Sequence, residues 1–290
     1  MNTASLQQRK GSPMRLISAM DMKIRLMILA IPMIAMACKQ KHVGQKSFTY
    51  FSENVRDSFD IYITLPNSFK KDQPLNVFYY LDANIKSGNK IREIIRDSSL
   101  KPDFTNSLFV GIGHRGDFHV LRRRDFTVPQ IVGPDTLGVS TNFGHIERFY
   151  QFLTQELIPY INTHYNTNKA ANSILGHSFG GLFTVYALFK NDTIFKNYYA
   201  LSPSLWVSDY SVYKFNNLTP ASGKSKSLFI SVGGLELLNR IKSGTDEFDR
   251  FLKGKNYESL RFTYIVYPGE THNSEVPYAL TDILCRKQLH

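Results

Sequence analysis

Short apolar runs alternate with amphipathic stretches through most of the chain after residue 46. Uninterrupted apolar runs are typical of strands that are covered on both faces, whereas apolar residues at every third or fourth position predict helices. Strands are predicted at 47–55, 58–65, 75–81, 108–112, 198–201, 228–232 and 261–267, with another ending at 175. Helices are predicted at 90–97, 146–164, 182–189, 245–252 and 277–289. This alternation predicts an α/β fold with a mostly parallel sheet wrapped on both faces.

A long segment between two predicted elements, residues 114–144, has no clear period and is expected to be irregular. Loops of this length inside a compact domain usually have a function or are mobile. The segment contains Arg122, Arg123 and Arg124, followed by Asp125. Because it leaves the carboxyl end of a strand, we expect it to lie near any site at that edge of the sheet.

The first 46 residues read as a leader, which leaves 47–290 as a single domain. A positive stretch at 22–25 precedes an uncharged run, 26–38, that is too short to span a bilayer and ends in small residues before Cys38. This arrangement resembles a bacterial lipoprotein signal, in which Cys38 would be acylated. It implies a bacterial cell-envelope protein that faces the periplasm and is held to the membrane by its lipid alone. Ordinary cleavage near Ala37 is the alternative. In either case, residues 1–21 read as an extension upstream of Met22, which is a natural start.

Composition narrows the class of partner. The formal net charge is +11, but no dense Lys/Arg tract is interleaved with aromatic residues, so nucleic acid is not an expected partner. A hydrophobic content of 42% is enough for a large core. The two cysteines, Cys38 and Cys285, do not form a disulfide framework.

A G-x-S-x-G motif stands at the centre of the chain, in the stretch Gly176-His177-Ser178-Phe179-Gly180-Gly181. An apolar run leads into it and a helical pattern follows, so Ser178 is predicted to lie on a tight turn between a strand and a helix. Such a turn exposes the serine hydroxyl above the sheet edge, and Gly176 and Gly180 are expected to allow a close approach that a Cβ would obstruct. Ser178 is therefore the candidate nucleophile.

A hydrolytic serine needs a base within hydrogen-bond reach and a carboxylate that orients the base. In α/β-hydrolases these residues follow the serine in the order acid, then histidine, in loops after later strands. His272 follows the last predicted strand and is the candidate base. Glu236, just after the strand 228–232, is the first candidate for the acid, with Asp209, Asp246 and Asp249 as alternatives.

Further stretches resemble the branch of the α/β-hydrolases that includes esterase D and the enterochelin-type siderophore esterases. Besides the serine motif, the resemblance rests on Phe195-Lys196-Asn197-Tyr198, Ser202-Pro203-Ser204-Leu205-Trp206, Thr271-His272, the Arg122–Thr127 stretch and the Phe152–Pro159 stretch. It covers roughly residues 47–289. Two departures are Ala83, where relatives often have glycine after an aspartate, and Val207, where they often have a second tryptophan.

The resemblance implies an α/β-hydrolase fold and a serine esterase that needs no cofactor and no metal. The backbone N–H of Phe179 and one near Ala83 or Asn84 are expected to form the oxyanion hole. The expected substrate is a small-molecule ester of the siderophore type. The alternatives are an acyl or feruloyl ester of a carbohydrate, or a catalytically silent binding protein of the envelope.

Three residues are candidates for substrate binding: Arg122, Arg124 and Trp206. Guanidinium groups offer a fork of donors that suits carboxylates, catecholates and phosphates. The alternative for the arginines is structural, with Arg124 and Asp125 clamping the loop.

Overall fold

The computed structural model describes residues 44–67, 69–70, 72–96, 99–129, 143–219, 225–237 and 240–285. The proposed leader and Cys38 lie outside the described residues. Among the residues that are described, no helix is long and apolar enough to cross a membrane.

An eight-stranded sheet forms the centre of the domain, in the order β1-β2-β4-β3-β5-β6-β7-β8. The strands are β1 (Gln45–Ser52), β2 (Asp57–Thr64), β3 (Asn76–Leu81), β4 (Ser107–His114), β5 (Asn172–His177), β6 (Phe195–Leu201), β7 (Lys226–Gly233) and β8 (Leu260–Tyr267). Strand β2 pairs antiparallel with both β1 and β4, and all other neighbours pair in parallel. The sheet is therefore mostly parallel, as the sequence predicts.

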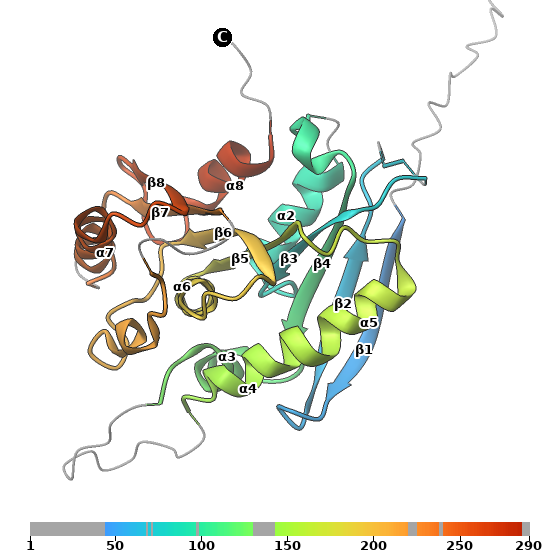
Figure 1. Ribbon diagram of the computed structural model, residues 1–290, viewed down its shortest axis with the longest axis horizontal. Helices are drawn as coiled ribbons and strands as arrows, with labels where there is room; N and C mark the ends of the chain where they lie inside the picture. Colours follow the sequence, from blue (N-terminus) through green and yellow to red (C-terminus); the bar gives the residue numbers. More distant parts are fainter. Residues whose placement is uncertain are drawn as a thin grey trace, which may run out of the picture. The chain divides into compact units, whose positions relative to one another are not determined.

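Helices cover both faces of this sheet (Figure 1). Helices α2 (Lys86–Arg96) and α8 (Val276–Leu284) lie on one face. The other face carries α4 (Ile146–Gln151), the π-helical turn η2 (Phe152–Leu157), α5 (Ile158–His164), α6 (Phe179–Phe189) and α7 (Ile241–Lys255). Helix α3 (Phe118–Phe126) packs against α4 and α6, and short 3₁₀ turns occur at η1 (Pro102–Phe104) and η3 (Ser211–Phe215).

Each face of the sheet has its own apolar core. On the larger side, Phe149, Phe152 and Phe183 pack with Phe59 in a cluster of aromatic rings whose centroids lie 4.5 to 5.5 Å apart. On the other side, Ile91 and Ile95 of α2 and Leu280 of α8 cover Phe78. Because both faces are covered, the central strands β3, β4 and β5 are almost wholly buried, which explains the apolar runs at their centres.

Helix α3 is the main difference from the expected architecture, because it lies in the segment 114–144 that was predicted to be irregular. Asp117 caps its first turn by accepting hydrogen bonds from the N–H groups of His119 and Val120 at 3.0 and 3.3 Å. Its buried residues include Arg122 and Asp125 as well as Phe126, so the helix has no continuous apolar stripe. Strand β1 also begins at Gln45, two residues inside the predicted linker.

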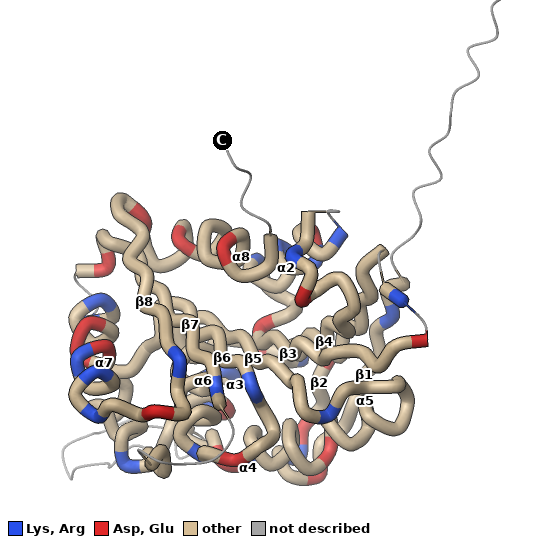
Figure 2. The backbone as a smooth tube through the Cα atoms, turned by 45° about the horizontal axis from the view of Figure 1, so that its top comes forward, with Lys and Arg blue, Asp and Glu red and all other residues tan. Residues whose placement is uncertain are grey.

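The carboxyl ends of the parallel strands meet at one edge of the sheet, which is where α/β proteins place their sites. Ser178 follows β5, Ser202 follows β6, Glu236 follows β7 and His272 follows β8. Charged residues elsewhere are mixed in sign (Figure 2): along α7, Lys242 pairs with Asp246 and Lys253 with Asp249.

Candidate active site

Ser178 lies on a strained turn between β5 and α6. Its backbone φ and ψ are 61° and −116°, a conformation that L-residues other than glycine rarely adopt. The turn is held from β6, because Ser178 N–H donates to the Leu201 carbonyl at 2.9 Å, and its carbonyl accepts from Ser204 N–H at 3.1 Å. This geometry presents the Ser178 hydroxyl at the sheet edge, 3.3 Å from Ser204 Oγ.

Glycines make the turn possible: of the two that the motif suggested, Gly176 is required and Gly180 is not. A Cβ on Gly176 would lie 2.1 Å from the carbonyl oxygen of Gly180, so this position excludes any side chain. A Cβ on Gly180 would meet nothing closer than 3.4 Å, which is ordinary contact. The second tight position is Gly181, where a Cβ would lie 3.0 Å from the Leu201 carbonyl and from Pro203. The expectation for Gly180 is therefore corrected.

Glu236 and His272 form a hydrogen-bonded pair. Nδ1 of His272 lies 2.6 Å from Oε2 of Glu236, whose side chain is buried, while the imidazole remains partly exposed. The other carboxylate oxygen of Glu236 accepts from Gly233 N–H at 2.7 Å and from Ser202 Oγ–H at 2.6 Å. Both oxygens are thus fixed, and the carboxylate can hold the imidazole with a proton on Nδ1 and a free Nε2.

The alternative acids are engaged elsewhere. Asp246 accepts from Lys242 Nζ at 2.7 Å and from the Tyr264 hydroxyl at 2.6 Å. Asp249 pairs with Lys253 at 2.7 Å, and Asp209 is exposed in the segment after β6. Among the contacts of the described residues, the carboxylate that meets His272 belongs to Glu236.

Ser178 and His272 open onto one pocket of about 380 Å³. Its lining also includes Phe179, Ser204, Trp206, Arg240 and Ile241. Trp206 thus lies where the sequence expectation put a substrate-binding residue. Arg240, whose guanidinium lies 5.4 Å from the centre of the Tyr210 ring, was missed. It follows the Glu236 loop, but its sequence neighbourhood carries no motif that could have identified it.

Arg122 and Arg124 do not line this pocket, which corrects their assignment as substrate-binding candidates. Arg122 is buried and donates to Asp82 Oδ1 at 2.6 Å and to the His177 carbonyl at 3.1 Å. Arg124 pairs with Asp125 through two nitrogens and with Asp57 at 2.8 Å. Arg122 thus ties the ends of β3 and β5 together, and Arg124 clamps α3 to the start of β2, as the structural alternative holds.

One expected oxyanion-hole donor is also corrected. The N–H of Ala83 donates to the Ile112 carbonyl at 3.0 Å, so it is used in extending the β3–β4 pairing. The neighbouring N–H of Asn84 makes no hydrogen bond within the part of the chain that the structure describes. Phe179 opens α6, and the first N–H groups of a helix have no partner inside it. Of the expected donors, Phe179 N–H and Asn84 N–H therefore remain candidates for the oxyanion hole, because neither makes a hydrogen bond among the described residues.

His177 supports the candidate base in a way that the sequence did not reveal. Its Nε2–H donates to the carbonyl oxygen of His272 at 2.7 Å, and the two rings lie 4.5 Å apart between centres. Burial and the neighbouring His272 lower the pKa of His177 to about 3, so it stays neutral and serves as a fixed donor. Its position beside the serine depends on the geometry of the turn, which spacing alone does not give.

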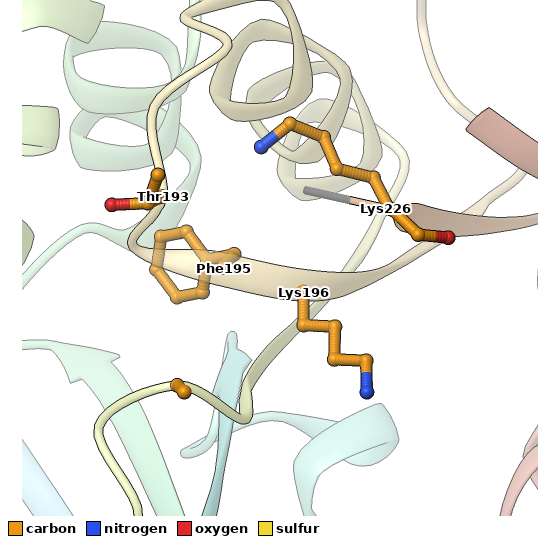
Figure 3. A pocket seen from close by; sticks show the side chains of 6 residues that line it. Thr193, Phe195, Lys196 and Lys226 are labelled. Carbon is orange, nitrogen blue, oxygen red and sulfur yellow. The ribbon is translucent and has the colours of Figure 1, made fainter. Parts of the chain in front are cut away.

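Another hollow, of about 290 Å³, lies at the opposite edge of the sheet (Figure 3). It is lined by Thr193, Phe195 and Lys196 at the start of β6 and by Lys226 at the start of β7. Burial lowers the pKa of Lys226, whose Nζ donates to the Asp192 carbonyl. These are the amino ends of the parallel strands, so this hollow is separate from the pocket of Ser178. Among the described residues, no group of three or more His, Cys, Asp or Glu side chains is placed to hold a metal ion.

The chain is similar to known proteins in both sequence and structure. Ferri-bacillibactin esterase BesA of Bacillus subtilis (strain 168) is 29% identical over 255 residues, which are 82% of this chain and 87% of that protein. The crystal structure of the BES protein from Bacillus cereus is 26% identical and superposes with a TM-score of 0.72, covering 83% of this chain and 94% of that chain.

A solved ferulic acid esterase has a TM-score of 0.57 and covers 83% of this chain and 96% of that one. At 17% identity, this likeness shows the fold alone. Residues 52–273, well over half of the chain, match the model of the family described as "Putative esterase". With its mostly parallel sheet and the serine turn after β5, the chain belongs to this esterase family, within the α/β-hydrolases.

Proposed function

We propose that this protein is a serine esterase that hydrolyses siderophore-type carboxylic esters through an acyl-enzyme. The observation that carries the proposal is the Glu236–His272 pair at 2.6 Å, with its imidazole on the same pocket as Ser178. A nucleophile, a base and a group that orients the base are the parts that acyl transfer from an ester requires.

The proposed reaction begins with attack of Ser178 Oγ on the ester carbonyl while Nε2 of His272 takes the hydroxyl proton. The N–H groups of Phe179 and Asn84 stabilise the negative charge on the carbonyl oxygen. His272 then protonates the departing alcohol oxygen, which leaves an acyl group on Ser178. A water molecule that gives its proton to His272 hydrolyses this acyl-enzyme, and the proton returns to Ser178 as the acid leaves.

The siderophore assignment rests on two supports. BesA, which is named a ferri-bacillibactin esterase, is similar over most of its length, and further curated relatives are named as siderophore esterases. The pocket also offers the ring of Trp206 and the guanidinium of Arg240, a combination that suits flat, electron-rich and anionic groups such as catecholates.

The test has two parts. Wild-type protein should hydrolyse a p-nitrophenyl ester, and Ser178→Ala should lose activity by roughly a million-fold, the typical cost of removing a triad nucleophile. A fluorophosphonate should label Ser178 in the wild type and leave the variant unlabelled, whereas Ser204→Ala should still be labelled. An active Ser178→Ala protein would refute the mechanism, and a wild type that binds esters without cleaving them would support the binding-protein alternative.

A substrate panel tests the second part. Ferric siderophore esters with a triscatecholate core should be cleaved with a higher kcat/KM than feruloylated sugars. Preference for the sugar esters would reject the siderophore assignment and keep the serine mechanism.

We further propose that the protein is a bacterial lipoprotein, anchored through an acylated Cys38 and facing the periplasm. The support is the sequence of the leader: a positive stretch, a short apolar run and small residues before the cysteine. Mass spectrometry of the mature N-terminus should find a diacylated or triacylated cysteine. An unmodified N-terminus near residue 38 in the soluble fraction would reject the anchor.

A further inference from the structure

A second glutamate lies behind the Glu236–His272 pair and plays no part in the proposed reaction. Glu275 is fully buried at the start of α8. Its Oε1 lies 3.0 Å from Ser202 Oγ, and its Oε2 accepts from Ser231 Oγ at 3.1 Å. Ser202 Oγ is also the group that lies 2.6 Å from Glu236 Oε1. One serine hydroxyl thus bridges two buried carboxyl groups.

Because a serine hydroxyl carries a single hydrogen, this bridge bears on which of the two carboxyl groups is protonated. Ser202 can donate its hydrogen fully to one carboxyl group only, so a full hydrogen bond to the other requires that this second group is protonated and donates to Ser202. Both oxygens of Glu236 already face donors, Gly233 N–H and Nδ1 of His272. On Glu275, Oε2 accepts from Ser231, and Oε1 is left to carry a proton toward Ser202.

We propose that Glu275 is a positioning residue for the Glu236–His272 pair: as a neutral carboxylic acid it donates to Ser202 Oγ, which makes the Ser202 hydroxyl donate to Glu236 and fixes that carboxylate against the imidazole. This inference rests on the proposed serine esterase function, since it describes how the base of that reaction is held. Ser202 itself has a φ of 41°, so its backbone is strained into the position that bridges the two groups.

The surroundings of Glu275 favour the neutral form. Burial first, and then the nearby carboxyl groups of Glu236 and Glu270, raise its pKa to about 7, although Ser202 and Ser231 could donate hydrogen bonds to the ionised form and so lower it. The charge of Glu275 in turn helps to raise the pKa of Tyr267 at the end of β8, after burial and the hydrogen bond and charge of Asp282. When Glu275 ionises, Ser202 is drawn to donate to it, and Glu236 loses a donor and gains a negative neighbour.

The experiment compares four variants across pH 5.5 to 9, using a soluble p-nitrophenyl ester. Glu275→Gln keeps a donor for Ser202 and an acceptor for Ser231, so its kcat at pH 6 should equal that of the wild type. Glu275→Ala keeps neither group, so its kcat should fall. Ser202→Ala should lower kcat by about 10- to 100-fold, the usual value of a hydrogen bond to a charged group. Ser231→Ala is the matched control. It removes a comparable hydrogen bond to Glu275, on the side away from Glu236, and should leave kcat unchanged.

The pH profile distinguishes positioning from simple packing. Wild-type kcat should show a decline above pH 7 that is absent in Glu275→Gln. Identical profiles for these two proteins, or a loss in Glu275→Gln at pH 6 as large as in Ser202→Ala, would overturn the proposal. A wild type that cleaves no ester would instead refute the proposed function.

In that case, NMR of the His272 Nδ1–H proton still tests the inference. The signal should weaken as the pH rises through 7 in the wild type and should persist in Glu275→Gln. The same pH dependence in both proteins would overturn the proposal.

Discussion

At the scale of single residues, the site depends on which partner each polar group has. Glu236 accepts from three donors, and its bond to His272 Nδ1 sets the tautomer that leaves Nε2 free for Ser178. Sequence order predicted Ser178, Glu236 and His272 because each follows a strand that ends at the same edge of the sheet. Sequence order could not show that Ala83 N–H donates to the Ile112 carbonyl, because that hydrogen bond depends on the register of two strands.

Glu236→Gln tests the orienting role directly. An amide can present its NH₂ to His272, which favours the tautomer with a proton on Nε2 and blocks proton removal from Ser178. We expect kcat to fall by about 10⁴-fold, as for amide replacement of the acid in other triads, with the fold retained. Asp246→Asn, which removes a carboxylate bound by Lys242 and Tyr264, should leave kcat unchanged. Equal losses in the two variants would contradict the assignment of the acid.

At the scale of elements, the strands were predictable and helix α3 was not. The buried strands have continuous apolar sequences because both faces of the sheet are covered. Helix α3 buries two charged residues, Arg122 and Asp125, so its pattern of apolar residues is broken. The sequence shows that arginines are present, but their partners, Asp82 and Asp57, are distant in the chain and become visible only in the fold.

Arg122 and Arg240 should respond differently to substitution because one is buried in an ion pair and the other faces the pocket. Arg122→Met leaves Asp82 buried without its partner and should lower the free energy of unfolding by about 3 to 5 kcal/mol, measured by urea denaturation. Its effect on KM should be the same for neutral and anionic esters.

Arg240→Ala should leave stability nearly unchanged and raise KM for an anionic ester alone, and the increase should shrink with added salt because an exposed charge is screened. If Arg122→Met discriminates between the two esters and Arg240→Ala does not, the two roles are reversed.

At the scale of the whole molecule, stability should depend on pH through buried groups near the site. Glu275 has a pKa raised by burial from 4.5 to about 7 in the folded protein. A carboxyl group with a raised pKa binds more protons when folded than when unfolded, so its contribution to stability falls as the pH rises from about 4.5 to about 7. The full change in the free energy of unfolding is on the order of 3 kcal/mol, because a tenfold change in a proton-binding constant corresponds to about 1.36 kcal/mol.

His177 acts in the opposite direction. Burial lowers its pKa from 6.5 to about 3, so the folded protein binds fewer protons than the unfolded chain, and stability is lost as the pH falls below about 6.5. The wild-type curve therefore combines two opposing slopes between about pH 4.5 and 6.5 and cannot be assigned to either residue by itself. A comparison with Glu275→Gln removes everything that the two proteins share, including His177.

Urea unfolding of both proteins between pH 4.5 and 8 gives the difference in their free energies of unfolding. Relative to the wild type, Glu275→Gln should become steadily more stable as the pH rises to about 7, because glutamine does not titrate. Above that pH the difference should stay constant, because Glu275 is by then ionised. A difference that does not change with pH would mean that Glu275 has an ordinary pKa and is charged over most of this range. An ionised Glu275 has no proton to donate to Ser202. The Ser202 hydroxyl would then donate to Glu275, and Glu236 would lose this hydrogen bond.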